Sequence, residues 1–267
     1  MFAWLKERRR KRLLDDWAIP DAQWQAALHE LPFLDHYDAA ALARLRELST
    51  LFLVEKNIVS GADDGPHALD VTPLMRIIIA AQACLLILGR DESVTEALHD
   101  YGGFDNVVVH PDDFPSTQDY EDEAGVVHTS DEMVLGESLP QGPVLLSWPA
   151  VEAGYEDSGM ALVIHEFAHK IDMLDGEVDG IPPLHGEARR AFAHALGAAF
   201  DDFRHRVEGD EDTAIDPYAA EDIGEFFAVS CEVFFAEPEL LREEYPDYVG
   251  ELRRYFRIDP VAGRILG

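Results

Sequence analysis

The segment HEFAHKID, residues 165–172, holds two histidines four residues apart, with a glutamate directly after the first. In a helix of 3.6 residues per turn, side chains at i and i+4 project from one face, so His165 and His169 can bind one metal ion. Glu166 lies on the flank of that face. Zinc held by three protein groups keeps a position for water, and a nearby carboxylate can take that water's proton. The motif therefore predicts a zinc site that hydrolyses peptide bonds, with Glu166 as general base.

A third ligand must come from further along the chain, where acidic residues compete: Asp175, Glu187, Glu225 and Glu232. Asp175 would suit a chain that turns sharply after the second histidine, but that turn favours Gly where this sequence has Asp172. Glu187 lies in GEARR, where a carboxylate at a helix start, beside the helix dipole, is the simpler interpretation.

The segment EFFAVSCEVFF, residues 225–235, favours Glu225. Its apolar residues are spread around the whole helix circumference, which indicates a buried helix. Glu225 and Glu232 are its only charges, and a buried carboxylate is costly unless it is paired or bound to metal. The alternative for Glu225 is a salt bridge or a helix-start charge. For Glu232 we expect a hydrogen bond to a ligand, with an ordinary internal ion pair as the alternative. Asp172, on the face of the two histidines, is a second candidate for such an outer partner.

These residues require helices and a sheet to hold them, and the pattern along the chain predicts an α+β fold. Apolar residues at three- and four-residue intervals predict helices over 20–29, 39–53 and 73–88, and later over 158–174, 187–206 and 221–236. Short aliphatic runs predict strands at 107–109, 125–127 and 144–146, separated by turns rich in Asp, Pro and Gly. We expect polar links over 60–65 and 176–186. We expect a mainly helical region, 1–95, followed by a catalytic domain, 96–267, with a single compact unit as the alternative.

Composition limits the partners. The chain has 267 residues and a formal net charge of -32, which would repel the phosphate backbone of nucleic acid, so we expect no direct nucleic-acid binding. A basic run, residues 6–12, is the local exception: it either contacts an anionic lipid or acidic partner, or is a solvated helix face docked on this acidic protein, which we favour. The apolar run 77–89 is too short to span a membrane. Two cysteines without CxxC spacing, and no export signal, fit the cytoplasm.

The quoted residues resemble the Mlc titration factor A family of zinc-dependent peptidases, whose catalytic part is similar to that of anthrax lethal factor. The family pattern has HEFAHKxD and a Tyr seven residues before the liganding Glu, here Tyr218 and Glu225. Further matches are PFLDHYDAAALARLREL, RIIIAAQACLLILG and GPVLLSW. Ala161 and Leu139 depart from the family's Asn and Trp.

The resemblance implies a zincin-like fold with one zinc ion bound by His165, His169 and Glu225. It also implies that Glu166 is the base and that Tyr218 helps to hold the oxyanion. For function it implies peptidase or aminopeptidase activity and, in some members, binding of a glucose-responsive transcriptional repressor. We expect a cytoplasmic zinc peptidase acting on a peptide or protein. The rival is a zinc-stabilised binding protein that sequesters such a Mlc-like repressor and whose peptidase activity is vestigial; a pure scaffold would need neither Glu166 nor Tyr218.

Overall fold

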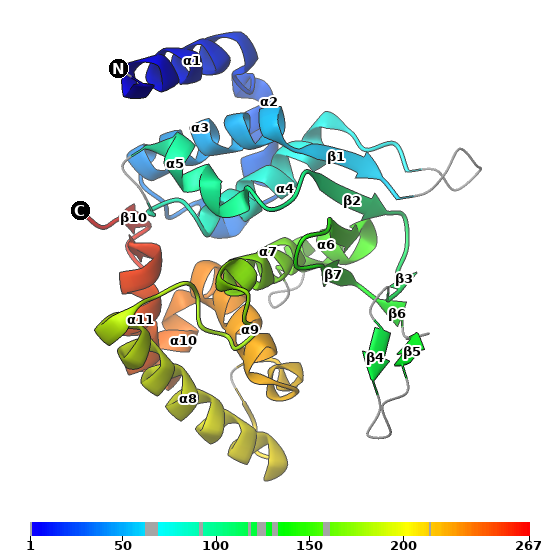
Figure 1. Cartoon of the computed structure of the whole chain (residues 1–267), viewed down its shortest axis with the longest axis vertical. Coiled ribbons are helices and arrows are strands. Elements are labelled where there is room, and N and C mark those ends of the chain that lie inside the picture. The colour runs from blue at the N-terminus through cyan, green and yellow to red at the C-terminus, as the bar shows by residue number, and fades with distance from the viewer. Residues whose placement is uncertain are drawn as a thin grey trace.

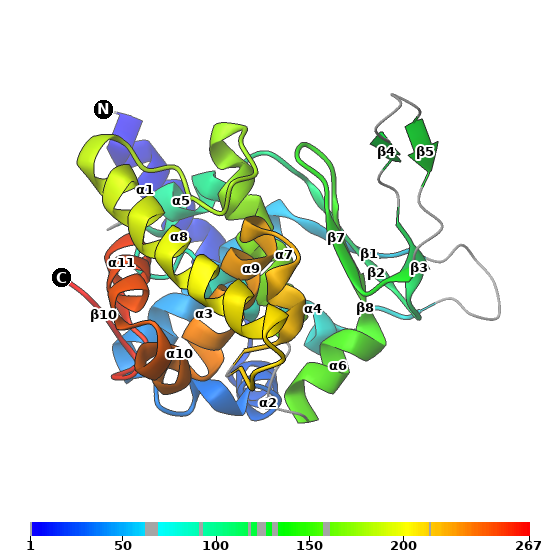
Figure 2. The same cartoon turned by 90° about the horizontal axis from the view of Figure 1, so that it is seen from below.

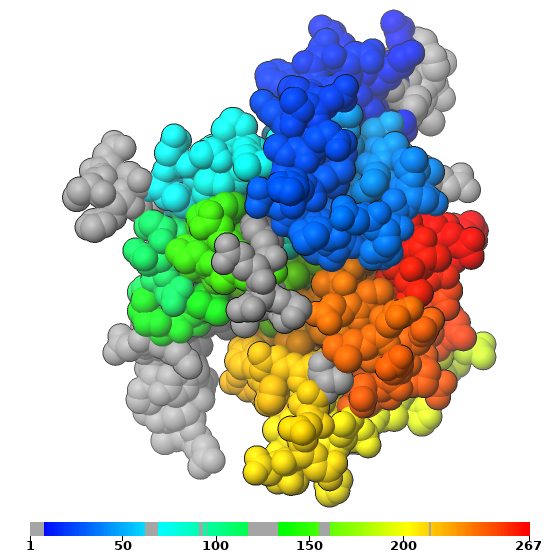
Figure 3. All heavy atoms as spheres, turned by 180° about the vertical axis from the view of Figure 1, so that it is seen from behind, coloured from blue at the N-terminus to red at the C-terminus, as the bar shows by residue number. Residues whose placement is uncertain are grey.

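The computed structural model describes residues 2–61, 69–90, 93–116, 119–121, 127–129, 133–156, 161–213 and 215–267. The chain begins with helices at one end of the molecule, coloured from blue to blue-green in Figure 1; Figure 3 shows the blue ones from behind. These are α1 (Phe2–Trp17), α2 (Asp21–His29), α3 (Ala39–Glu55), α4 (Pro73–Leu85) and the short α5 (Val94–Ala97). Thr72 caps α4 through its side chain, and Asp38 caps α3 in the same way.

A four-stranded sheet lies next, in the order β1-β2-β8-β7. Strands β1 (Asn57–Ser60), β2 (Asn106–His110) and β8 (Val144–Ser147) are parallel, and β7 (Gly136–Ser138) pairs antiparallel with β8 at the edge. Two short pairs extend from the sheet: β3 (Phe114–Pro115) with β6 (Met133–Val134), and β4 (Asp119–Glu121) with β5 (Val127–Thr129). The edge strand β7 packs against the helix that carries the histidines.

Helices form the other half of the molecule (Figure 2). After α6 (Trp148–Glu156) come α7 (Leu162–Asp172), α8 (Gly186–Glu208), α9 (Ile223–Ala236), α10 (Pro238–Glu244) and α11 (Pro246–Phe256). The short helices η1 (Pro32–Leu34), η2 (Leu98–Tyr101), η3 (Met173–Asp175) and η4 (Pro217–Ala220) lie in connections, and β9 (Ile258–Asp259) pairs with β10 (Arg264–Ile265) near the end. Helix α7 packs directly on α9, and α8 packs outside them against α9 and α11.

An aromatic cluster joins α7 to α3 and to the segment 101–104. The ring of Phe167 lies 5.8 Å from that of Phe52 on α3, 5.1 Å from Tyr101 and 5.8 Å from Phe104. Such edge-on and tilted contacts add to the burial energy of each ring. The N-terminal helices therefore support the histidine helix directly. Because β1 also pairs with β2, the segments 1–95 and 96–267 share one sheet; the division into two domains stays a prediction.

The mixture of helices with a small sheet confirms the α+β class. The helices predicted over 20–29, 39–53, 73–88, 187–206 and 221–236 correspond to α2, α3, α4, α8 and α9. The helix predicted over 158–174 is α7, with residues 158–160 outside the described ranges, and the strand predicted over 125–127 is described only at Val127.

Two expectations about connections were incomplete. Strand β1, which pairs with β2, was not predicted and lies just before the predicted link at 60–65. Helix α6 was not predicted either and directly follows β8. Among the described residues, no helix is long and apolar enough to cross a membrane. Cys84 and Cys231 are free and buried.

Candidate metal centre

Helix α7 holds both histidines and is buried on nearly every side. Ile164, Phe167, Ala168 and Ile171 are fully buried, as the periodicity predicted for the core face. The opposite face is covered by α9, so that His165 is only 9% exposed. Ala161 is the residue at the N-cap position and its methyl group offers no capping bond, whereas an Asn there could accept one.

Helix α9 brings the third candidate ligand to this face. Asp222 caps its start, accepting hydrogen bonds from the backbone N–H groups of Gly224 (2.7 Å) and Glu225 (2.9 Å). The cap fixes where the helix begins and places Glu225 in the first turn, facing α7. Residues 226–235 are all buried, which confirms the prediction of a helix buried around its whole circumference. Glu225 therefore does lie at a helix start, as the alternative interpretation anticipated, and it also contacts both histidines.

Three side chains converge between the two helices. The Nε2 atoms of His165 and His169 lie 3.1 Å apart. Glu225 Oε2 lies 3.1 Å from His165 Nε2, and Glu225 Oε1 lies 3.3 Å from His169 Nε2. One ligand atom from each of the three residues lies within 4.8 Å of the others. Sequence reasoning nominated this trio, and the fold brings all three together.

The contacts within the trio are poor as hydrogen bonds and good as a ligand set. Glu225 Oε2 is buried and has no well-aligned hydrogen-bond donor, although His165 Nε2 is 3.1 Å away. The facing imidazole nitrogens cannot both act as acceptors for one another. Ligands about 2.0–2.1 Å from a tetrahedral zinc ion are separated by roughly 3.3 Å, close to the spacings here. The donor atoms therefore fit a metal ion.

Glu232, about two turns after Glu225 on α9, holds the ring of His165. Its Oε1 accepts a hydrogen bond from His165 Nδ1 at 2.8 Å, and Glu232 is only 3% exposed. In the neutral ring, donation of the Nδ1 proton to this carboxylate leaves the lone pair on Nε2, which faces the trio. This is the contact anticipated for Glu232, and it is also an internal ion pair when His165 is protonated, so both anticipated roles fit it.

Charges within the cluster shift its protonation strongly. Burial by itself lowers the pKa of His165, but the carboxylates of Glu225 and Glu232 outweigh it and raise that pKa well above its ordinary value. Burial by itself raises the pKa of Glu225, but the two histidines hold it far below its usual range. A metal ion at this cluster therefore competes with a proton on His165.

Glu166 points toward the edge strand rather than into the trio. It is 4% exposed, and burial raises the pKa of its carboxyl, with partial compensation from His165 and His169. Its Oε1 lies against the backbone of Gly136: a Cβ atom at that position would lie 2.3 Å from it. Its Oε2 is buried without a hydrogen-bond partner among the described residues. The carboxylate is thus held beside the cluster with one oxygen unused.

A cavity of about 280 Å³ opens in front of Glu166 and His165. Strands β6 and β7 and the residue between them form one wall, and the segment carrying Asp216, Tyr218 and Glu221 forms another. The Tyr218 ring centroid lies 6.5 Å from that of His165. Burial and then the nearby Glu225 and Glu221 raise the pKa of the Tyr218 phenol, so it keeps its proton at neutral pH. Tyr218 is 54% exposed and faces the cavity.

The other acidic candidates lie elsewhere. Asp175 accepts from Arg189 Nη1 at 3.3 Å, and Glu187 is an exposed carboxylate in the first turn of α8, as its sequence context indicated. Asp172 is fully buried on the histidine face, but its carboxylate forms no hydrogen bond to either histidine. Burial raises its pKa to about 6, against the opposing effect of the Gly180 backbone.

Sequence reasoning missed the residues that fasten the edge strand to α7. Ser138 Oγ donates to the Glu166 carbonyl at 2.7 Å. Lys170, 5% exposed, donates to the carbonyls of Leu139 and of Gly142, the latter at 2.9 Å. Lys170 directly follows the candidate ligand His169, and a charged residue at that place in a predicted buried helix was the signal that could have marked it as a structural contact. These bonds hold β7 beside Glu166.

The sequence pattern of the glucose-regulated metallo-peptidase M90 family matches residues 5–257. The chain belongs to this family. Relatives of this M90 chain include proteins called Mlc titration factor A. The one from Serratia proteamaculans is 35% identical over 249 residues, which are 90% of this chain and 88% of that protein. The one from Klebsiella pneumoniae is 32% identical over 253 residues, 94% and 91% of the two chains. The one from Yersinia pestis is 32% identical over 244 residues, 90% and 86%.

Membership of the M90 family confirms the resemblance drawn from HEFAHKID and the surrounding motifs. It makes the chain a member of a metallopeptidase family, and the His165, His169 and Glu225 cluster can hold a metal ion.

Proposed function

We propose that this protein is a zinc-dependent peptidase of zincin-like architecture, similar in its catalytic part to anthrax lethal factor. His165, His169 and Glu225 hold one zinc ion, and Glu166 is the general base. One observation carries the proposal: two imidazole Nε2 atoms and a carboxylate converge within 4.8 Å, beside a buried glutamate with an unpartnered oxygen. Hydrolysis by HExxH zinc sites needs this combination of ligands and base.

Zinc is the ion that suits this set of donors. Two imidazoles and one carboxylate are the protein ligands of many catalytic zinc sites, which leave a position for water. Bound there, zinc would polarise a peptide carbonyl and make a water molecule more acidic. Glu232 supports the site by holding His165 in the tautomer whose Nε2 can act as a ligand.

Glu166 and Tyr218 supply the remaining steps. Burial raises the pKa of Glu166, which makes its carboxylate a better acceptor for the proton of the attacking water. The proton then passes from Glu166 to the leaving amine. Tyr218, protonated at neutral pH and facing the same cavity, donates a hydrogen bond to the oxyanion that forms from the peptide carbonyl.

The substrate is a peptide or protein, and aminopeptidase action is one form that the activity can take. We place the enzyme in the cytoplasm as part of the same proposal, because its two cysteines are buried, free thiols.

A second candidate function is suggested by the relatives' name, Mlc titration factor A. In this alternative the protein binds a Mlc-like transcriptional repressor and sequesters it, and the zinc site mainly stabilises the fold. Intact Glu166 and Tyr218 favour the peptidase, since sequestration requires neither a base nor an oxyanion donor.

The test is zinc content together with hydrolysis of a peptide library, measured for the wild type and for Glu166→Gln. We expect the variant to keep about one zinc ion and the fold, and to lose turnover by about 100-fold or more. The exposed, helix-start Glu187→Gln is the matched control and should behave like the wild type. Unchanged turnover in Glu166→Gln would remove Glu166 from the mechanism, and an inactive zinc-loaded wild type would favour the binding protein.

A further inference from the structure

The cavity in front of Glu166 has an apolar floor and an open rim. Leu162 and Val229 lie at the floor and are 5% and 3% exposed. Met133 and Tyr218 lie at the rim on opposite walls and are 59% and 54% exposed. An extended apolar stem can therefore enter between these walls.

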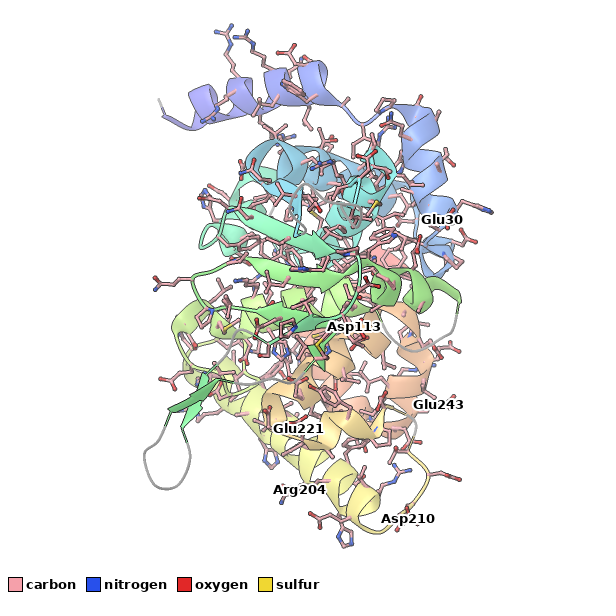
Figure 4. All side chains as sticks on the ribbon, turned by 90° about the vertical axis from the view of Figure 1, so that its right-hand side faces the viewer. Glu30, Asp113, Arg204, Asp210, Glu221 and Glu243 are labelled. Carbon is pink, nitrogen blue, oxygen red and sulfur yellow. The ribbon has the colours of Figure 1, made fainter. Side chains whose placement is uncertain are left out.

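The charged side chains around this cavity are carboxylates, apart from His165 when its ring is protonated. Its lining contains the carboxylates of Glu166, Asp216, Glu221 and Glu232, and no lysine or arginine among the described residues. Glu232 is engaged by His165, and Glu166 lies deep beside the metal ligands. Asp216 and Glu221 line the cavity and are exposed, and Asp216 is the carboxylate on which the inference rests. Figure 4 labels Glu221 on the segment between α8 and α9.

We propose that this rim receives a cationic group of the substrate, an ammonium or a guanidinium close to the scissile bond. The inference rests on the proposed peptidase function and gives it a substrate class. A lysine or arginine side chain places its methylene stem along apolar surface and its charge in water, which matches the buried floor and the acidic rim. The oxygen of Glu166 without a hydrogen-bond partner among the described residues, in a side chain 4% exposed, lines the same cavity and points to a ligand there.

The rim is close enough to act on residues beside the bond that is cut. Tyr218 lies 6.5 Å from His165 between ring centroids, and Asp216 precedes it by two residues. An extended substrate advances about 3.3–3.6 Å per residue. Because Asp216 lines the same cavity as His165 and Glu166, a cation within one or two residues of the scissile bond can approach it. The net charge of -32 adds long-range attraction for cationic peptides, which salt will screen.

The charge of Asp216 can be removed without removing its hydrogen bond to the backbone. Its Oδ1 accepts the backbone N–H of Tyr218 at 2.9 Å and caps η4. An asparagine can accept the same bond, so Asp216→Asn removes the charge and keeps the turn. Glu243, an exposed carboxylate on α10 and also labelled in Figure 4, is outside the cavity lining, and Glu243→Gln is the matched control.

The experiment compares zinc-loaded full-length protein on matched peptides at low and high salt. One pair has lysine or norleucine beside the scissile bond, and each peptide is made with a free and with an acetylated amino terminus. We expect cationic peptides to have a KM lower by about two- to fivefold, and Asp216→Asn to remove that advantage without slowing neutral peptides. If the terminal ammonium is the ligand, peptides with a free amino terminus have a lower KM than acetylated ones, whether they contain lysine or norleucine. If the side chain is the ligand, the lysine peptides have a lower KM than the norleucine peptides in both forms.

A binding measurement separates this inference from the proposed function. The same peptides, fluorescently labelled, are titrated into Glu166→Gln and into Glu166→Gln combined with Asp216→Asn. Tighter binding of cationic than of neutral peptides, lost in the Asp216→Asn background, supports the inference. This holds even if neither the wild type nor any variant cleaves a peptide, a result that would contradict only the proposed peptidase activity. Equal affinity for cationic and neutral peptides, or an equal loss of affinity for both when Asp216→Asn is added, overturns the inference and does not contradict the peptidase activity.

Discussion

Replacing Glu225 with alanine should release the metal while leaving the fold in place. The substitution removes both oxygens that lie 3.1 and 3.3 Å from the two histidine Nε2 atoms. It leaves the backbone bond from the Glu225 N–H to Asp222, which caps α9, and the buried residues 226–235. Two histidines would remain, without the carboxylate that contacts both of them.

The expected loss can be scaled from the geometry. Glu232 contacts one ligand and not the cluster itself, so Glu232→Ala should weaken zinc binding by about 10- to 100-fold. Glu225 contacts both histidines, so Glu225→Ala should exceed 100-fold, or about 2.7 kcal/mol of binding free energy. Glu225 also raises the pKa of His165, so its removal weakens proton competition and offsets a small part of the loss. Measurement near pH 8 reduces this offset.

The assay is competition for zinc against a chromophoric chelator, with circular dichroism to verify folding. Asp175→Ala and Glu187→Ala are the controls, because neither carboxylate reaches the cluster, and both should match the wild type. An affinity of folded Glu225→Ala within threefold of the wild type would refute the assignment of this ligand.

Further variants test the other side chains. Tyr218→Phe should lower kcat by about 100- to 1000-fold with zinc retained, since oxyanion donors contribute roughly 2.7–4 kcal/mol; a rise in KM alone would make Tyr218 a binding residue. Gly136→Ala should lower kcat, because its Cβ would come within 3 Å of Oε1, Cδ and Cγ of the buried Glu166 side chain and displace it; unchanged kinetics would contradict the contact. Asp172 has a folded pKa of about 6, above its ordinary 3.8, so metal-free wild type should lose stability as pH rises from about 4 to 6. Asp172→Asn should lack that loss in thermal unfolding at pH 4.5 and 7.5, and an identical decline would show that another group titrates.

The ligand trio could be predicted because each member leaves a local signal. His165 and His169 share a face through helical spacing, and Glu225 is a charge on a helix that is otherwise apolar. Burial of that helix follows from its composition, and a carboxylate within it must be paired or ligated. The helices and the parallel strands β2 and β8 followed from periodicity in the same way.

Other features depend on contacts between distant segments. Gly136 touches Glu166 only because β7 crosses α7, and nothing near Gly136 in the sequence marks that approach. Strand β1 is four residues long and gains its ladder from β2, 49 residues later, so local propensity could not reveal it. Helices α10 and α11 each begin with a proline at their first position, a start signal that sequence reasoning left unused. The place of Tyr218 was implied by family resemblance rather than by local pattern.

Anomalous diffraction at the zinc edge, from crystals of the zinc-loaded protein, tests the central claim most directly. We expect one strong anomalous peak between α7 and α9, about 2.0–2.2 Å from His165 Nε2, His169 Nε2 and an oxygen of Glu225. Glu232 should remain bonded to His165 Nδ1, and Glu166 should stay outside the ligand distance. A zinc peak held by Glu166 or by residues other than these three, or its absence from this cluster in zinc-loaded crystals, would contradict the account.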